Sequence, residues 1–288
     1  MQLRLRGAAG GVAAFVLESG GGGMSCEQWK FLEQQLAERG LVLSYDRAGI
    51  GASDGNKTGT GAAEVADRLS SILEEVGMET PFVLVGYSLG GLYARYFAAT
   101  RPGSVLGLVL IDPTPLNDSE YGRSMTKLSV PVSIALVHLI AWGLYLFFRS
   151  GLASLLSGTI GRARGSALPD FVRRSALLGN YRHVRTVLSE LRSMGSIQRA
   201  AASLPLPAGL PVLCVSAAIP AKSQALLQRH HKKLSQEGAP PWSRHHEIPG
   251  ASHGTLVTNP EYAKILGEHI LSFAQQISAQ APVKGTPR

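Results

Sequence analysis

The 288-residue sequence predicts an α/β fold in which helices cover both faces of a mostly parallel central sheet. Three observations predict it. Short apolar runs, typical of strands buried on both faces, alternate with helical patterns along the chain. A G-x-S-x-G sequence connects one such run to the helix after it. With 45% hydrophobic and 17% charged residues, the chain can bury one sizeable core, and no low-complexity linker divides it into halves.

The expected strands and helices follow one another in regular alternation. Residues 2–5 alternate as in an edge strand, and short apolar runs that predict buried strands lie at 12–17, 41–45, 81–85, 106–111 and 211–215. A last strand signal lies near 246–249. Helical patterns lie at 27–39, 62–76, 90–100 and 261–277. The polar, Pro- and Gly-containing residues 279–288 are expected to form a disordered tail.

One connection is far longer than a crossover helix needs, because about a hundred residues separate Ile111 from Pro211. This spacing predicts a core of residues 1–112 and 210–278 with a helical cap inserted at 113–209. Leu128–Phe148 in the cap carries no formal charge. It is interpreted as a cap helix, a helix lying in a membrane surface, or a membrane span. Topology opposes the span, because the strands on either side of the insertion return to the same sheet.

The formal charge of +8 is concentrated in the second half of the insertion. Nine arginines, no lysine and only two acidic residues lie between Arg149 and Arg199. This basic segment is either a solvated pair of helices or a surface attracted to an anionic membrane or an acidic substrate. No nucleic-acid-binding module accompanies the charge. Two cysteines imply no disulfide framework, so a cytoplasmic location is expected, with membrane association as an alternative.

The sequence Val83-Leu-Val-Gly-Tyr-Ser-Leu-Gly-Gly91 has the context in which a serine becomes a nucleophile. The strand-to-helix turn is so sharp that side chains at Gly86 and Gly90 are expected to collide with neighbouring backbone. Ser88 is then left at the apex of the turn, above the sheet. A chance occurrence in a chain with 33 glycines is the alternative, but the flanking strand and helix patterns argue against it.

A serine nucleophile requires a general base, which is expected near the C-terminus. His253 lies in a Gly-flanked loop between the last strand and the last helix, where its imidazole can reach Ser88. The paired histidines, His230–His231 and His245–His246, lie in polar stretches and are expected to face solvent.

The third member of a triad is harder to assign. The strand at 211–215 is followed by no carboxylate until Glu237. Asp112, which ends the strand at 106–111, is on the same sheet edge as Ser88 and is the candidate acid. An aspartate before Pro113 can instead be structural, bonding loop amides, and both interpretations remain open.

The negative charge of an acyl-transfer intermediate needs backbone N–H donors. One is expected from Leu89, the residue after the nucleophile, at a helix N-terminus whose dipole helps. The other is expected from the Gly-rich loop Glu18–Met24, with Gly21 as the candidate donor. A phosphate-binding interpretation of that loop lacks the G-x-G-x-x-G pattern and a following Lys-Ser/Thr.

These motifs resemble the α/β-hydrolase superfamily over nearly the whole chain outside the cap and tail. Asp46-Arg-Ala-Gly-Ile-Gly-Ala-Ser53 is similar to the family's D-R-x-G-x-G-x-S segment, which is usually structural. The resemblance implies an eight-stranded sheet, a cap between strands six and seven, and a Ser-His-acid triad whose acid follows strand six in some members. Two departures are that Glu18-Ser19 replaces the common His-Gly and that only one strand fits ahead of Val12.

The expected function is that of a serine hydrolase cleaving a carboxylic ester or related acyl bond through an acyl-enzyme on Ser88. His253 takes the proton, Asp112 supports His253, and no metal or organic cofactor is required. A membrane-proximal lipase or thioesterase acting on an apolar substrate is one alternative. A non-catalytic ligand-binding protein with the same fold is another, because no acid follows Val215.

Overall fold

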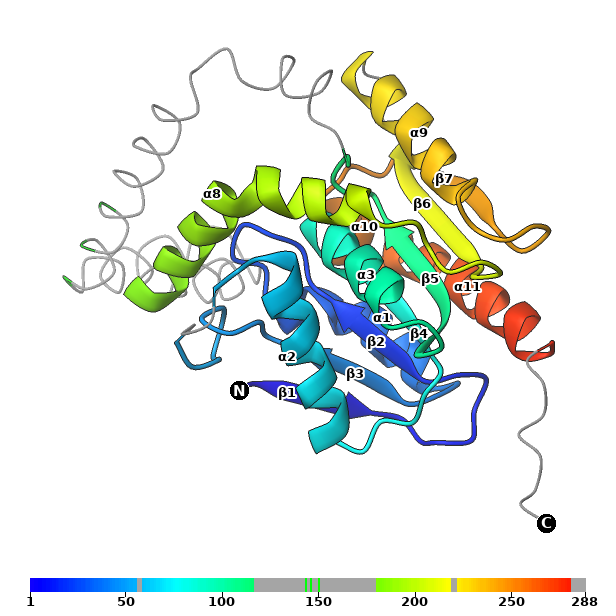
Figure 1. The fold of residues 1–288 in the computed structure, drawn as a ribbon, viewed down its shortest axis with the longest axis horizontal. Coiled ribbons are helices and arrows are strands. Elements are labelled where there is room, and N and C mark those ends of the chain that lie inside the picture. Colours follow the sequence, from blue (N-terminus) through cyan, green and yellow to red (C-terminus); the bar gives the residue numbers. More distant parts are fainter. Residues whose placement is uncertain are drawn as a thin grey trace, which may run out of the picture.

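The computed structural model describes residues 1–55, 59–116, 143, 146, 150, 180–218 and 222–280. Its centre is a seven-stranded sheet in the order β1-β3-β2-β4-β5-β6-β7 (Figure 1). Only β1 runs antiparallel to its neighbour, and the other described pairs are parallel. The predicted α/β class is therefore confirmed. The strands are β1 Leu3–Arg6, β2 Phe15–Glu18, β3 Val42–Tyr45, β4 Phe82–Tyr87, β5 Val105–Ile111, β6 Val212–Ala218 and β7 Arg244–Pro249.

Each predicted strand is present, with ends shifted by a few residues. Where the family resemblance implied eight strands, the described residues form seven, so the long insertion falls between the fifth and sixth strands rather than the sixth and seventh. The physical reason is the short segment before β2, which has room for the single strand β1. The expected strand at 12–17 begins later in the structure, since residues 12–14 precede β2.

Helices cover both faces of the sheet, as the alternating pattern predicted. They are α1 Lys30–Ala37, α2 Ala62–Glu75, α3 Leu89–Thr100, α8 Tyr181–Ser203, α9 Lys222–Ser235, α10 Thr255–Thr258 and α11 Pro260–Ser278, with a 3₁₀ turn at Cys26–Trp29. One core layer packs α1, α10 and α11 on the sheet, and a second packs α2, α3 and α9 on the opposite face. Alternate residues of β4 supply the two layers: Val83 and Val85 face the first, and Leu84 faces the second.

Helix α9 was not predicted from the sequence. Most of its residues are polar, and among its described side chains those of His231, Leu234 and Ser235 are buried. Because one of these positions is a histidine, the apolar periodicity that indicates a helix is interrupted. Leu234 is buried in the core layer that also contains α2 and α3.

Of the predicted insertion at 113–209, the structure describes its two ends. Helix α8 lies alongside α3 and also contacts α2 (Figure 1). Ile197 and Ala201 of α8 are buried in one cluster with Leu92 and Tyr93 of α3. The apolar segment 128–148 lies outside the described residues except at two positions, as do residues 281–288 of the expected tail. Among the described helices, none is both long and apolar enough to cross a membrane.

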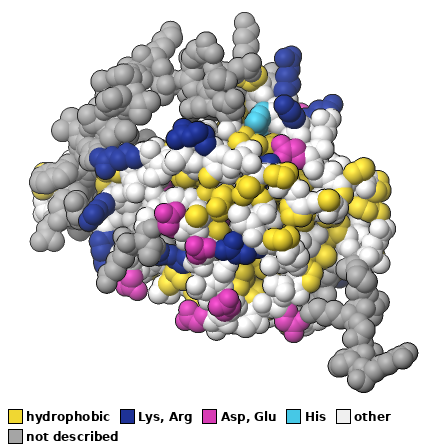
Figure 2. Space-filling model, viewed as in Figure 1, with side chains coloured by type: hydrophobic (Ala, Val, Ile, Leu, Met, Phe, Trp, Pro, Cys, Tyr) yellow, Lys and Arg dark blue, Asp and Glu magenta, His cyan; other side chains and the backbone are white. Residues whose placement is uncertain are grey.

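Four arginines on α8 point to solvent and form the described part of the Arg-rich segment: Arg182, Arg185, Arg192 and Arg199. Figure 2, in the same view as Figure 1, shows basic side chains at the upper left of the molecule, where α8 lies. Since their spacing of three and seven residues brings them to one helix face, α8 is amphipathic, with an apolar side on α3 and a basic side outward.

Candidate active site

Ser88 stands at the turn between β4 and α3, at the carboxyl edge of the sheet. Its backbone has φ 54° and ψ −120°, a conformation that non-glycine residues rarely adopt. A Cβ at Gly86 would lie 2.5 Å from the carbonyl oxygen of Gly90. A Cβ at Gly90 would lie 2.4 Å from the carbonyl oxygens of Glu18 and Ser19. The predicted steric need for both glycines is confirmed.

His253 reaches Ser88 from the loop between β7 and α10. Its Nε2 lies 3.0 Å from Ser88 Oγ, and its side chain is 51% exposed. Tyr87, one residue before the serine, donates from its hydroxyl to the His253 carbonyl oxygen at 2.6 Å. The two rings stack with centroids 4.9 Å apart. Sequence reasoning missed this role of Tyr87, which occupies the variable position of G-x-S-x-G.

Asp112 completes a hydrogen-bonded chain with these two residues. Its Oδ2 accepts from His253 Nδ1 at 2.6 Å, and its Oδ1 accepts from the backbone N–H of Ala217 at 3.1 Å. Because Nδ1 is the donor, the neutral imidazole has an accepting Nε2 toward the Ser88 hydroxyl. The two interpretations left open for Asp112 therefore both describe real contacts, since one oxygen holds the imidazole and the other holds a loop amide. Ala217 lies near the end of β6, the strand after which the sequence offers no nearby acid, and its N–H donates to Asp112 of the neighbouring strand end.

A second histidine lies against Asp112, contrary to expectation. His231 was expected to face solvent, but it is fully buried, with Nδ1 3.7 Å from Asp112 Oδ1. The reason is the inward face of α9, which packs on β6. Burial lowers the pKa of His231 to about 4, although the nearby Asp112 carboxylate opposes that shift. His231 is therefore neutral at pH 7.

The contacts of His231 fix its tautomer. Its Nε2 lies 2.9 Å from the Pro113 carbonyl oxygen, which only accepts, so Nε2 carries the proton. Nδ1 then accepts from the Ser216 hydroxyl at 2.7 Å, and Ser216 in turn accepts from His245 Nε2 at 2.7 Å. The side chains of His231, Ser216 and His245 thus form a hydrogen-bonded network beside Asp112. Among the described contacts, Asp112 is the one carboxylate that this network approaches.

The expected donors for an oxyanion lie side by side. A Cβ at Gly21 would fall 2.8 Å from Leu89 Cδ2, so the Gly-rich loop passes directly over the start of α3. Within the described part of the chain, neither the Gly21 nor the Leu89 N–H has a hydrogen-bond acceptor. The structure thus brings together all five residues singled out from the sequence: Ser88, His253, Asp112, Leu89 and Gly21.

The described residues contain no group of three or more His, Cys, Asp or Glu side chains arranged to hold a metal ion. The residues that meet at the carboxyl edge of the sheet are instead a hydroxyl, an imidazole, a carboxylate and two backbone amides. This set is suited to acyl transfer, in which a serine attacks a carbonyl and amides bind the oxygen that becomes negative.

A family model described as "Alpha/beta hydrolase family" matches residues 15–264, which is most of the chain. The chain belongs to the alpha/beta hydrolase family. This confirms the resemblance drawn from the sequence motifs, and membership supports a hydrolase.

Two curated relatives match parts of this alpha/beta hydrolase. The uncharacterized protein YqjL of Bacillus subtilis is 31% identical over 93 residues, which cover 32% of this chain and 37% of YqjL. The putative carbamate hydrolase RutD of Yersinia enterocolitica is 32% identical over 124 residues, which cover 43% of this chain and 44% of RutD. The matches thus span less than half the length of these curated relatives.

Among solved structures, a thermophilic esterase from Thermogutta terrifontis has the same fold. Its TM-score is 0.68 at 19% sequence identity, and the superposition covers 96% of this chain and 93% of the esterase. At this identity the likeness shows the fold, and the chemistry of this chain has to be argued from its own residues.

Proposed function

We propose that this alpha/beta hydrolase is a serine hydrolase that cleaves a carboxylic ester or a related acyl bond through an acyl-enzyme on Ser88. The observation that carries the proposal is the unbroken hydrogen-bond chain from Ser88 Oγ through His253 to Asp112. The first step requires a hydroxyl that donates, a nitrogen that accepts and a carboxylate behind it, and the three side chains are placed in that order.

In the first half of the reaction, Ser88 Oγ attacks the substrate carbonyl carbon while His253 Nε2 takes the hydroxyl proton. Asp112 stays ionised and stabilises the imidazolium that forms. The N–H groups of Leu89 and Gly21 bind the negative oxygen of the tetrahedral intermediate. The intermediate then collapses, the bond to the leaving group breaks, and His253 returns the proton to the leaving oxygen.

In the second half, His253 takes a proton from a water molecule as the water oxygen attacks the acyl-enzyme carbonyl. The second tetrahedral intermediate uses the same two N–H donors. Its collapse releases the carboxylic acid and returns the proton to Ser88 Oγ. Every proton in this cycle is held by Ser88, His253 or the reactants, so the described residues suffice for the chemistry.

A narrower candidate is a lipase or thioesterase that works beside a membrane on an apolar acyl chain. The observation that favours it is the basic outer face of α8, whose arginines would be attracted to anionic lipid headgroups. Residues 128–148, apolar in sequence, belong to the same insertion. For this narrower candidate, we propose that the protein binds the membrane surface through the basic face of α8 and residues 128–148.

The non-catalytic alternative depended on the absence of an acid after Val215. Asp112 accepts from His253, so that argument loses its basis and we favour the enzyme.

The test is hydrolysis of p-nitrophenyl esters of increasing acyl length, with a p-nitrophenyl carbamate added because of the similarity to RutD. The expected result is turnover by the wild type and a loss of at least about 10³-fold in Ser88→Ala. Asp112→Asn is expected to lose a similar factor, because an amide cannot stabilise the imidazolium. No turnover and no fluorophosphonate labelling of Ser88 in the wild type would overturn the proposal and favour a binding protein.

A further inference from the structure

Arg47 is a buried cation that the proposed mechanism does not use. Its side chain is 5% exposed, and its guanidinium donates four hydrogen bonds and forms ion pairs with two carboxylates. Burial by itself lowers the pKa of Arg47, but the carboxylates of Glu190 and Glu18 outweigh it and raise that pKa above its usual value. The guanidinium is therefore charged at neutral pH.

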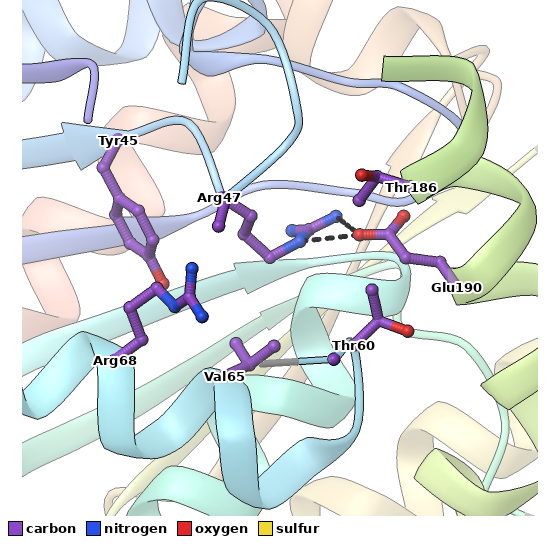
Figure 3. A pocket seen from close by; sticks show the side chains of 9 residues that line it. Tyr45, Arg47, Thr60, Val65, Arg68, Thr186 and Glu190 are labelled. Carbon is purple, nitrogen blue, oxygen red and sulfur yellow. Dashed lines mark hydrogen bonds and ion pairs between the residues drawn. The ribbon is translucent and has the colours of Figure 1, made fainter. Parts of the chain in front are cut away.

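The acceptors of Arg47 come from two different parts of the molecule. Nε donates to Glu190 Oε1 of α8 at 2.9 Å, and Nη2 forms an ion pair with the same oxygen at 2.8 Å. Nη1 donates to Glu18 Oε1 at 2.7 Å. Figure 3 shows the Arg47–Glu190 pair from close by. The remaining two bonds go to backbone: Nη1 to the carbonyl oxygen of Ser19 at 2.5 Å and Nη2 to that of Gly20 at 2.8 Å.

The two backbone contacts set the orientation of two consecutive peptide units. In a trans peptide, the N–H points opposite to the C=O of the same unit. Because Arg47 binds the carbonyls of Ser19 and Gly20, the N–H groups of Gly20 and Gly21 are directed to the other side of the loop. In the amide orientation that satisfies both of its ends, Gln28 accepts from the Gly20 N–H at 3.2 Å. The Gly21 N–H, which has no acceptor among the described residues, is then the one left for an oxyanion.

A ligand-binding role for Arg47 is disfavoured by the space around it. The cavity beside Arg47 and Glu190, drawn in Figure 3, has a volume of about 10 Å³. That volume holds about one water molecule and no substrate. The bonds of Arg47 are thus directed at the protein itself, at the loop on one side and at α8 on the other.

We infer that Arg47 is a positioning residue: it holds the Gly-rich loop so that Gly21 presents its N–H beside Leu89, and Glu190 ties this arrangement to α8. The inference rests on the proposed function. Its consequence is that the contact between Arg47 and Glu190 of α8 affects the catalytic rate through the Gly21 N–H. A three-donor lysine cannot reproduce the five-donor fork at this position.

The test compares Arg47→Lys and Glu190→Gln with a matched control, Arg95→Lys. The side chain of Arg95 is also 5% exposed, and it also donates to two backbone carbonyl oxygens. These belong to Ala201, in the last turn of α8, and to Leu204, the residue after α8. It does not touch the Gly-rich loop in the described structure. Loss of α8 docking alone would therefore affect all three variants, whereas loss of the loop conformation would affect only the first two.

The expected result for p-nitrophenyl ester hydrolysis is a fall in kcat of about 10²-fold in Arg47→Lys, with KM within about 3-fold, because an oxyanion donor is needed mainly in the transition state. Glu190→Gln is expected to lose about 10-fold in kcat, since Arg47 keeps its loop contacts but its bond to α8 is no longer to a charged acceptor. Arg95→Lys is expected to lower the Tm and to change kcat by less than 2-fold. An equal fall in kcat for Arg95→Lys, or a change confined to KM, would overturn the inference.

Hydrogen exchange of peptides covering residues 18–24 gives a second readout that does not need activity. Exchange is expected to be faster in Arg47→Lys than in the wild type and unchanged in Arg95→Lys. If the wild type neither hydrolyses esters nor labels with a fluorophosphonate, the proposed function fails, and faster exchange still supports the positioning of the loop by Arg47. Unchanged exchange in Arg47→Lys overturns it. Should Arg47→Lys not fold, Glu190→Gln is judged by the same two readouts.

Discussion

The burial of His231 predicts a measurable dependence of stability on pH. The folded protein binds the His231 proton only near pH 4, whereas the ordinary pKa of a histidine is 6.5. Between these two values the unfolded chain binds a proton that the folded chain does not, so stability falls as the pH falls. At about 1.4 kcal/mol per unit, the full difference is about 3 kcal/mol, of which about 2 kcal/mol is lost between pH 7 and pH 4.5.

The groups around His231 explain why its pKa does not return to normal. Burial is the largest cause of the lowered pKa, Asp112 opposes it, and His230 and His245 add to it. His231→Gln keeps a donor toward the Pro113 carbonyl and an acceptor for the Ser216 hydroxyl but cannot titrate.

Urea unfolding at pH 7 and pH 4.5 measures the effect. The wild type is expected to lose about 2 kcal/mol more than His231→Gln, because the carboxylates that titrate in this range are common to both proteins. His230→Gln serves as a control for the neighbouring, half-buried ring, and its pH dependence is expected to stay closer to that of the wild type. Parallel losses in the wild type and His231→Gln would refute the reasoning, since they would mean that His231 takes up its proton equally in both states.

Three further substitutions have expected outcomes. Gly90→Ala places a Cβ 2.4 Å from two backbone carbonyl oxygens, so it is expected to lower the free energy of unfolding in urea by at least about 2 kcal/mol. Gly195 lies inside α8, and a Cβ there would have its nearest neighbour at 3.4 Å. Gly195→Ala is therefore expected to raise the free energy of unfolding by about 0.5–1 kcal/mol. Equal effects would contradict the steric argument. Tyr87→Phe removes the 2.6 Å bond to the His253 carbonyl but keeps the stacked ring, so kcat is expected to fall by about 5-fold with KM unchanged, and an unaltered kcat would show that the bond does not hold the imidazole. Asn259→Ala removes the cap that accepts from two N–H groups at the start of α11 and is expected to cost about 1 kcal/mol, a loss that thermal unfolding would detect.

Those parts of the fold that depend on local pattern could be predicted from the sequence. The strands at β4 and β5 are continuous apolar runs, and the G-x-S-x-G turn between β4 and α3 is defined by the steric demands of Gly86 and Gly90. The position of Asp112 at a strand end placed it on the same edge as Ser88, so this partner of His253 could be named in advance.

Other features could not be predicted, because they depend on contacts between distant residues. His231 is polar by type, and only the packing of α9 on β6 makes it a buried neighbour of Asp112. Arg47 was expected to be structural, but its bond to Glu190 joins residues 143 positions apart and follows no sequence motif. A local pattern predicts strands, helices and tight turns, and tertiary packing decides which side chains meet.

The strand order has a consequence for synthesis on the ribosome. Residues 1–111 contain β1 to β5, which are contiguous in the finished sheet, whereas β6 begins only at Val212. At about 5–20 residues per second, the intervening stretch of about a hundred residues takes about 5–20 s to emerge. During that interval β5, an apolar strand that is central in the native sheet, has one unpaired edge, which is the kind of surface that promotes aggregation. The edge of Val105–Ile111 therefore stays without its native neighbour until β6 has been synthesised.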